Sequence, residues 1–218
     1  MAKKNTFHFI LLGHQGSGKG TQAKLLAQKF NLVHLEIGNI LRTMVKTKSP
    51  LGRKVAQRID QGKLVPFYMI VEIVKDKLKA ISKNKGIVFD GTPRRMPEVA
   101  PLEKVLKKHG RQITHVFFIW ISQRETIKRL SKRRSCEKCG TLFISGKTLS
   151  VRAIKCPKCQ GKIIQREDDT PVSIRKRLIW SHQKTGPVIE SYRRQGKLIE
   201  INGEQSIQKV FKDILSYL

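Results

Sequence analysis

Apolar residues along this chain gather in short runs, and longer segments with helical spacing separate them. Five runs have the length and the composition of buried strands: residues 7–12, 32–35, 87–89, 115–121 and 198–201. After Pro66, a residue favoured at the start of a helix, Val71, Val74, Leu78 and Ile81 recur at intervals of three or four residues. Strands that alternate with helices predict an α/β fold, in which helices cover both faces of a five-stranded parallel sheet.

One segment breaks this alternation. Residues 132–169 show no long helical periodicity and contain all four cysteines of the chain. Helical patterns at 122–131 and 171–195 flank the segment on either side. We therefore expect an inserted subdomain at 132–169 within an otherwise continuous α/β unit.

The first strand leads into a glycine-rich turn. Residues 13–21 read Gly-His-Gln-Gly-Ser-Gly-Lys-Gly-Thr, and an amphipathic run follows them to Phe30. A strand, a glycine-rich turn and a helix in this order form the context of a phosphate-binding loop (P-loop). Glycines let successive N–H groups turn toward one anion, and the start of the helix adds its positive end. We expect a nucleotide phosphate to contact six residues of this loop: Gly16, Ser17, Gly18, Lys19, Gly20 and Thr21.

The loop departs from the common form at one position. Gly20 stands where a serine or threonine hydroxyl usually reaches magnesium, and Thr21 follows one place later. This variant still predicts the P-loop nucleoside triphosphatase type of fold. The alternative interpretation is a glycine-rich helix start that binds no ligand.

The cysteines form two pairs with the same spacing, Cys136 with Cys139 and Cys156 with Cys159, and sixteen residues separate the pairs. Each pair can wrap a short turn around one ion, and four thiolates complete a tetrahedral zinc shell. Such a shell has no open position for water, so we expect a structural metal. The alternative is a pair of disulfides, which a cytoplasmic chain would keep reduced.

The chain is strongly basic. Its 218 residues include 45 Lys and Arg against 16 Asp and Glu, a formal net charge of +29. This charge predicts nonspecific affinity for polyanions such as nucleotides, RNA or anionic lipid, although a solvated basic surface explains most of the lysines. The amino-terminal residues run straight into the first strand, and no apolar stretch approaches the length of a membrane span. We expect a cytoplasmic protein without a membrane partner.

Four further segments, taken with residues 13–23, resemble adenylate kinase of the long, zinc-containing type. They are residues 38–42, 62–66, 89–94, and 166–169 together with 174–178. The resemblance covers essentially the whole chain. It implies a core (1–35, 66–131 and 170–218), an acceptor-binding segment for the nucleoside monophosphate (36–65) and a zinc-binding lid (132–169).

The resemblance also implies a function, the reversible transfer ATP + AMP = 2 ADP by a monomer that uses Mg²⁺ with ATP. It implies catalytic roles for Lys19, Asp90, Arg94, Arg133, Arg166 and Arg177. On the ATP side it adds Arg133 and Gly203 to the loop. On the AMP side it implies contacts from Ile37, Arg42, Val65, Gly91, Arg94, Glu98, Arg166 and Arg177.

Four positions depart from the pattern of this family and concern the acceptor base. Ile37 replaces a threonine, Glu98 replaces a glutamine that reads adenine, Asn39 replaces an aspartate and Thr92 replaces a phenylalanine. A glutamine amide complements the amine and the ring nitrogen of adenine, whereas an ionised Glu98 only accepts hydrogen bonds and matches the two adjacent donors of guanine. AMP is the expected acceptor, and GMP is the alternative. A third possibility is that Glu98 faces solvent or pairs with an arginine such as Arg95, leaving the base to backbone groups.

A rival interpretation comes from another class of protein. The net charge and the paired cysteines are also typical of a zinc-ribbon protein that binds nucleic acid. The aromatic fraction of 6% and the lack of any strand studded with aromatic residues argue against it, because single-stranded bases are commonly held by stacking.

Overall fold

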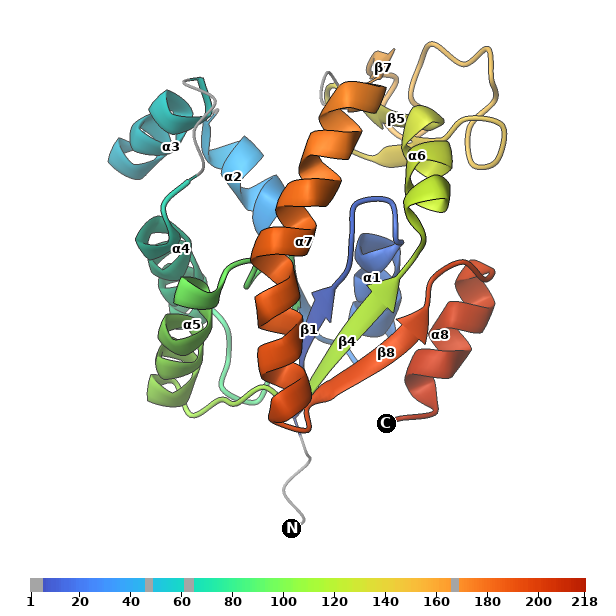
Figure 1. The fold of residues 1–218 in the computed structure, drawn as a ribbon. Coiled ribbons are helices and arrows are strands. Elements are labelled where there is room, and N and C mark those ends of the chain that lie inside the picture. Colours follow the sequence, from blue (N-terminus) through green and yellow to red (C-terminus); the bar gives the residue numbers. More distant parts are fainter. Residues whose placement is uncertain (1–5, 46–48, 61–64, 166–168) are drawn as a thin grey trace.

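The structure is a computed structural model, and it describes residues 6–45, 49–60, 65–165 and 169–218. At its centre is a five-stranded sheet, in which every neighbouring pair of strands is parallel (Figure 1). The strand order is β2 (Val33–Glu36), β3 (Ile87–Asp90), β1 (His8–Leu12), β4 (His115–Trp120) and β8 (Leu198–Asn202). The five predicted strands are confirmed, each to within one residue at either end.

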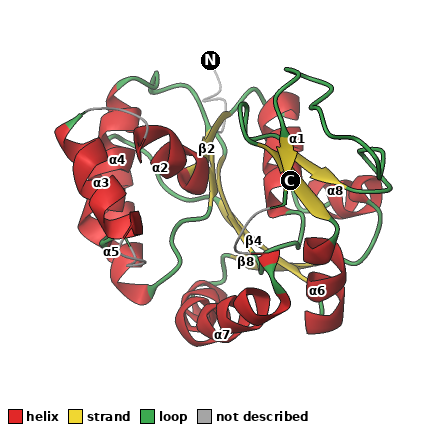
Figure 2. Ribbon diagram, turned by 90° about the horizontal axis from the view of Figure 1, so that it is seen from above, coloured by secondary structure: helices red, strands yellow, loops and turns green. Residues whose placement is uncertain are grey.

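Helices cover both faces of the sheet (Figure 2). Side chains alternate along β1, so that Phe9 and Leu11 pack against α1 (Lys19–Lys29) and α8 (Ile207–Leu215). Ile10 and Leu12 point to the other face, which is covered by α4 (Phe67–Lys79), α5 (Met96–Lys108) and α7 (Pro171–Arg194). Burial on both faces explains why the inner strands β1 and β3 are almost continuously apolar, and the helices on both sides of a parallel sheet confirm the α/β class.

The buried face of α4 is wider than the sequence pattern predicts. Val74 and Leu78 are buried as expected, and Ile81 packs against the same core just beyond the helix. Val71, however, is only half-buried, and Met69, Ile70 and Ile73 complete the buried face. A helix that packs against both the sheet and α5 needs a broader apolar face than a single stripe.

Two insertions lie at the carboxyl edge of the sheet. The first follows β2 and contains α2 (Ile37–Val45) and α3 (Pro50–Asp60). The second lies between α6 (Gln123–Ser131) and α7, and its three antiparallel strands have the order β6 (Leu142–Ile144), β5 (Arg133–Cys136) and β7 (Ile163–Ile164). We call residues 132–165 the insert. Among the described helices, none combines the length and the apolar character that crossing a bilayer requires.

Candidate active site

The glycine-rich loop joins β1 to α1 at the carboxyl edge of the sheet, where ligands of open α/β sheets bind. Gly16 and Gly18 have φ angles of 82° and 93°, a region that residues with side chains avoid. A Cβ on Gly13 would lie 2.5 Å from the carbonyl oxygen of Ile119, so no side chain fits there. The carbonyl of Gly18 accepts the N–H groups of Thr21 and Gln22, which begins α1. The predicted strand, loop and helix are therefore all present.

Lys19 is the first residue of α1, and its Nζ lies 3.4 Å from the carbonyl oxygen of His14. Burial is the main reason that the pKa of Lys19 is lowered to about 8; the carboxylate of Asp90 opposes this shift, and the nearby guanidinium groups of Arg94 and Arg133 add to it. Several cations thus converge at one place with few carboxylates among them. This arrangement favours the binding of an anion with several negative charges.

Asp90 ends β3, directly opposite Glu36 of β2 in the sheet register. Burial by itself raises the pKa of Asp90, but a contact with His34 at 3.7 Å and the charge of Lys19 bring the pKa below its usual value. Asp90 is therefore ionised, although only 6% of its surface is exposed. A Cβ at Gly20 would lie 3.0 Å from Oδ2 of Asp90. The carboxylate thus lies beside the position from which P-loops of the common form supply a hydroxyl to magnesium. Carboxylate oxygens are ligands that magnesium prefers.

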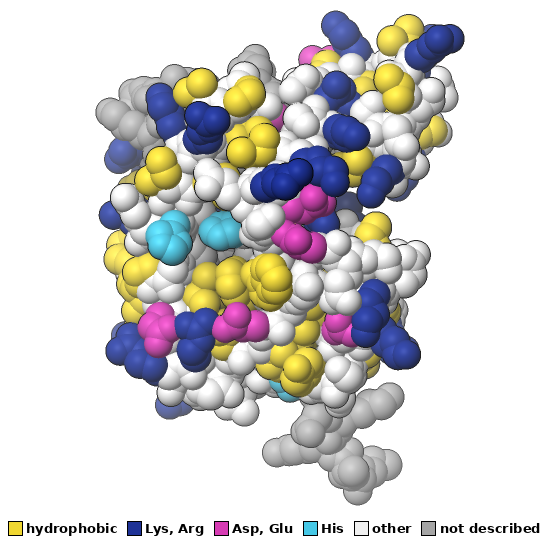
Figure 3. Space-filling model, turned by 45° about the vertical axis from the view of Figure 1, so that its right-hand side comes forward, with side chains coloured by type: hydrophobic (Ala, Val, Ile, Leu, Met, Phe, Trp, Pro, Cys, Tyr) yellow, Lys and Arg dark blue, Asp and Glu magenta, His cyan; other side chains and the backbone are white. Residues whose placement is uncertain are grey.

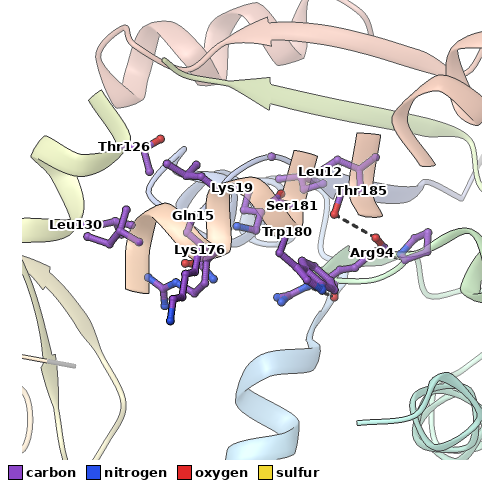
Figure 4. Close-up of a pocket in the computed structure, with 17 residues that line it drawn as sticks. Leu12, Gln15, Lys19, Arg94, Thr126, Leu130, Lys176, Trp180, Ser181 and Thr185 are labelled. Carbon is purple, nitrogen blue, oxygen red and sulfur yellow. Dashed lines mark hydrogen bonds between the residues drawn. The ribbon is translucent and has the colours of Figure 1, made fainter. Parts of the chain in front are cut away.

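A cavity of about 360 Å³ opens between the loop, the segment after β3 and α7 (Figure 4). Lys19 and Gln15 line it from the loop side, and Gly91 and Arg94 line it from the β3 side. Nε of Arg94 donates a hydrogen bond to the carbonyl of Gly91 at 2.9 Å, and the Thr185 hydroxyl donates to the carbonyl of Arg94 at 3.1 Å. Arg94 is thereby held at the mouth of the cavity, facing α7.

Asp169 organises two of the predicted arginines. Its side chain is buried, and it accepts hydrogen bonds from Nε and Nη2 of Arg133 at 2.7 and 2.5 Å. It also accepts a bond from Nη2 of Arg177 at 3.0 Å. One carboxylate therefore fixes a guanidinium from β5 and another from α7. Bidentate pairing of this kind sets the orientation of the guanidinium plane as well as its position.

The four cysteines of the insert converge to one point. Their sulfur atoms all lie within 4.8 Å of one another, with 3.4 Å between Cys136 and Cys159 and 3.8 Å between Cys139 and Cys156. These distances are too long for disulfides, and all four thiols are free. Sulfurs around one zinc ion, at about 2.3 Å from it, lie about 3.8 Å apart. The cluster therefore fits the predicted tetrahedral metal site.

The close approach of the sulfurs also changes the protonation of the thiols. A hydrogen bond with Thr141 lowers the pKa of Cys139 to about 6. The backbone N–H of Gly161 lowers the pKa of Cys159, but the neighbouring sulfurs of Cys136 and Cys139 outweigh it and raise the pKa to about 12. Four sulfurs this close do not all ionise without a cation between them.

Comparison with known proteins places this site in a family. The family model described as adenylate kinase matches residues 11–197. The chain belongs to the adenylate kinase family. It is 38% identical to the adenylate kinase of Acetivibrio thermocellus over 210 residues, 96% of each chain. It is 37% identical to the adenylate kinase of Caldicellulosiruptor bescii over 96% of this chain and 97% of that one. It is 34% identical to that of Archaeoglobus fulgidus over 97% of both chains.

On the acceptor side, the structure separates residues that the adenylate kinase pattern groups together. Ile37 is 3% exposed and packs in the core with Ile70 and Val74, so its side chain does not face the cavity. Arg42 lies nearer the surface, 3.3 Å from the carboxylate of Glu36.

Glu98 is buried, and both of its oxygens are engaged. One accepts the backbone N–H of Arg94 at 2.7 Å, and the other accepts Nε of Arg95 at 2.8 Å. Nη2 of Arg95 also donates a hydrogen bond to the carbonyl of Val65 at 3.3 Å. Of the possibilities left open by the sequence, the structure shows Glu98 paired with Arg95.

One further predicted residue, Gly203, stands apart from the cavity. Gly203 follows β8 and donates its N–H to the carbonyl of Trp120 at 2.8 Å, and a Cβ there would lie 2.7 Å from the side chain of Ile119. This packing explains why position 203 is a glycine, and Gly203 does not line the cavity. Arg166 lies outside the described residues.

Sequence reasoning missed several residues that lie at the site. Trp180 lines the cavity beside Arg94 (Figure 4), Asp169 orients two arginines, and Nη1 of Arg129 donates to the carbonyl of Gly16 at 3.3 Å. For Asp169 there was a usable signal, because it lies within residues 166–169, a segment that the family resemblance already covers. No comparable pattern pointed to Trp180.

The lowered pKa of Lys19 predicts that kcat/KM for ATP depends on pH. Only the protonated amine attracts phosphate, and in the free protein it loses its proton as the pH rises through about 8. The value of kcat/KM for ATP should therefore fall above pH 8, by up to about tenfold per pH unit. Lys19→Arg keeps its charge throughout this range, so its profile should not fall near pH 8, whatever its absolute rate. A flat profile of the parent up to about pH 9.5 would contradict the assignment.

Proposed function

We propose that this chain catalyses ATP + AMP = 2 ADP as a monomeric phosphotransferase of the cytoplasm. The observation that carries this proposal is the convergence of Lys19 and Arg94 on one cavity beside the phosphate loop, close enough to Asp90 for their charges to interact with its carboxylate. Membership of the adenylate kinase family supports the reaction. A site assembled from a single chain supports the monomer, and four free thiols fit a reducing compartment.

The chemistry requires alignment and charge neutralisation, and no covalent intermediate. We assign the outer phosphates of ATP to the loop N–H groups and to Lys19. Arg94 and Arg42 would bind the acceptor phosphate. Arg133 and Arg177, which Asp169 orients in advance, would stabilise the negative charge that develops on the transferring group. The remaining assignments follow the family pattern: Val65 and Gly91 at the acceptor, Arg166 at the phosphates, and Gly203 on the ATP side.

Two metal ions fit this scheme. Asp90 would hold Mg²⁺ through water, and the ion would neutralise charge on the ATP phosphates. Cys136, Cys139, Cys156 and Cys159 would hold a structural Zn²⁺ with a closed shell. We further propose that residues 36–65 bind the acceptor and that residues 132–169 act as a lid, which closes to exclude water and opens to release product.

A nucleotide panel tests this function. ADP formation from ATP should be followed with AMP, GMP, CMP and UMP in turn, with and without magnesium. We expect a clear preference for AMP and little turnover without magnesium. A strong preference for GMP would overturn the assignment to AMP and leave a nucleoside monophosphate kinase. If no acceptor gives turnover, the assignment of this chain as a nucleoside monophosphate kinase is overturned.

The Arg95–Glu98 pair yields a prediction about the acceptor base. Because both oxygens of Glu98 are already engaged, Glu98→Gln should not improve kcat/KM for AMP or for GMP. It should instead lower the free energy of unfolding by about 1–3 kcal/mol, because Arg95 loses its buried partner. Chemical denaturation and steady-state kinetics measure the two effects.

The matched control is the double variant Arg95→Gln/Glu98→Gln, which leaves no unpaired charge and should recover part of the lost stability. A several-fold gain in kcat/KM for AMP in Glu98→Gln would instead show that the carboxylate contacts the base.

The net charge supports a second, weaker property, which is adhesion to polyanions. Titration of a random oligonucleotide at rising salt concentrations tests it. We expect weak binding that salt abolishes. Tight, specific binding together with no kinase activity would favour the zinc-ribbon alternative.

A further inference from the structure

The insert differs from the rest of the chain in its charge. Residues 132–165 contain nine Lys and Arg against a single acidic residue, Glu137. Arg133 is buried against Asp169, and Arg134 is partly buried. The other seven basic side chains are exposed: Lys132, Lys138, Lys147, Arg152, Lys155, Lys158 and Lys162. Within the described chain, none of the seven lies within 4.0 Å of a carboxylate.

Large aliphatic side chains are exposed among these cations. Val151 and Ile154 are 77% and 74% exposed, the highest values among the large apolar side chains of the described chain. Val151 lies within a tight turn, which the bond from the N–H of Ala153 to the carbonyl of Ser150 closes, and Ile154 directly follows this turn. We call residues 147–155 the tip of the insert. Figure 3 shows Lys and Arg side chains around apolar ones at this outer end of the molecule.

The turn is built so that its apolar side chains point outward. The small core of the insert consists of Cys136, Phe143, Leu149 and Cys156, with Ala153 packed against it. Ala153 therefore faces inward, and its neighbours Val151 and Ile154 do not. An apolar pair held outward by backbone geometry, with unpaired cations on both sides, indicates a surface that meets a partner.

We propose that the tip of the insert docks on a membrane surface that contains anionic phospholipid. Aliphatic side chains enter the boundary between headgroups and acyl chains, while lysines beside them contact the lipid phosphates. Nucleic acid fits this surface less well. The one aromatic side chain of residues 132–165, Phe143, is buried, so none is exposed there for stacking on bases. The expectation of no membrane partner rested on the lack of a spanning segment, which does not bear on surface binding.

Vesicle co-sedimentation of the full-length chain, without nucleotide, tests the proposal independently of the kinase reaction. The chain should bind vesicles in which about a third of the lipid is phosphatidylglycerol, and it should not bind pure phosphatidylcholine. Val151→Ser/Ile154→Ser should lower the partition coefficient about tenfold at unchanged charge. Lys147→Gln/Lys155→Gln should lower it by a similar factor and weaken its dependence on salt.

Matched controls distinguish binding by the tip from the effects of net charge and of exposed apolar side chains elsewhere on the protein. Val172→Ser/Ile179→Ser removes two exposed aliphatic side chains from α7, and Lys107→Gln/Lys108→Gln removes two exposed charges from α5. Both should leave partitioning within about twofold of the parent. The proposal is overturned if vesicle binding is absent, or if the aliphatic variant binds like the parent. It is also overturned if the tip variants lose binding to a single-stranded oligonucleotide but not to vesicles.

Discussion

Lys19→Ala is expected to lower kcat about a thousandfold or more while the fold persists. Lys19 is the cation at the start of α1, beside the carboxylate of Asp90 and the guanidinium of Arg94. In phosphoryl transfer the charge on the transferring group is the main quantity that an enzyme stabilises, and alanine supplies none. Single-turnover and steady-state measurements of ADP formation from ATP and AMP give the size of the loss.

Stability distinguishes this effect from unfolding. Burial already disfavours the protonated amine of Lys19, so its removal should leave the melting temperature unchanged or slightly raised. Lys24→Ala is the matched control, because Lys24 is an exposed lysine on the same helix and should retain full activity. A folded Lys19→Ala protein with near-normal turnover would rule out the proposed mechanism.

The elements that sequence could predict are those whose signal is local. The inner strands β1 and β3 are buried along their whole length and nearly continuous in apolar residues, and the edge strands β2 and β8 keep shorter apolar runs, so the limits of these strands are visible without tertiary information. The strands of the insert contain only two to four residues each, and the metal cluster rather than an apolar pattern holds them together. The cysteine spacing therefore predicted the insert, whereas periodicity could not predict its sheet.

The site residues divide in the same way, into those that have a local sequence signal and those that do not. Lys19 begins the helix after β1, and Asp90 ends β3. Both lie at the carboxyl edge, where the topology of a parallel sheet brings ligand-binding groups together. Ile37 was assigned to the acceptor by its place in the family pattern, but as an apolar residue it packs into the core where α2 meets the sheet. Glu98 could not be placed from sequence alone, because its role depends on whether Arg95 folds back onto it. Only the three-dimensional structure supplies that contact.

Loss of the metal is expected to have the largest effect on stability. The buried core of the insert contains only four residues, and Cys136 and Cys156 are two of them, so little apolar surface remains once the ligands are lost. Structural zinc contributes most of the folding free energy of small domains that lack a core. Cys156→Ser should therefore destabilise the insert by about 5 kcal/mol or more and lower the melting temperature by roughly 10–20 °C.

The structural role of the metal is tested by which parts of Cys156→Ser lose their structure first. The parent should contain one zinc per chain by elemental analysis, and Cys156→Ser should contain less. Amide exchange should rise first in residues 132–165, while β1 and β4 stay protected. None of the four cysteines lines the cavity, so turnover at low temperature should fall far less than stability. Lys158→Gln, an exposed neighbour between the ligands Cys156 and Cys159, is the control and should keep both the zinc and the melting temperature. A parent protein without stoichiometric metal, or one with a disulfide between these cysteines, would refute the assignment.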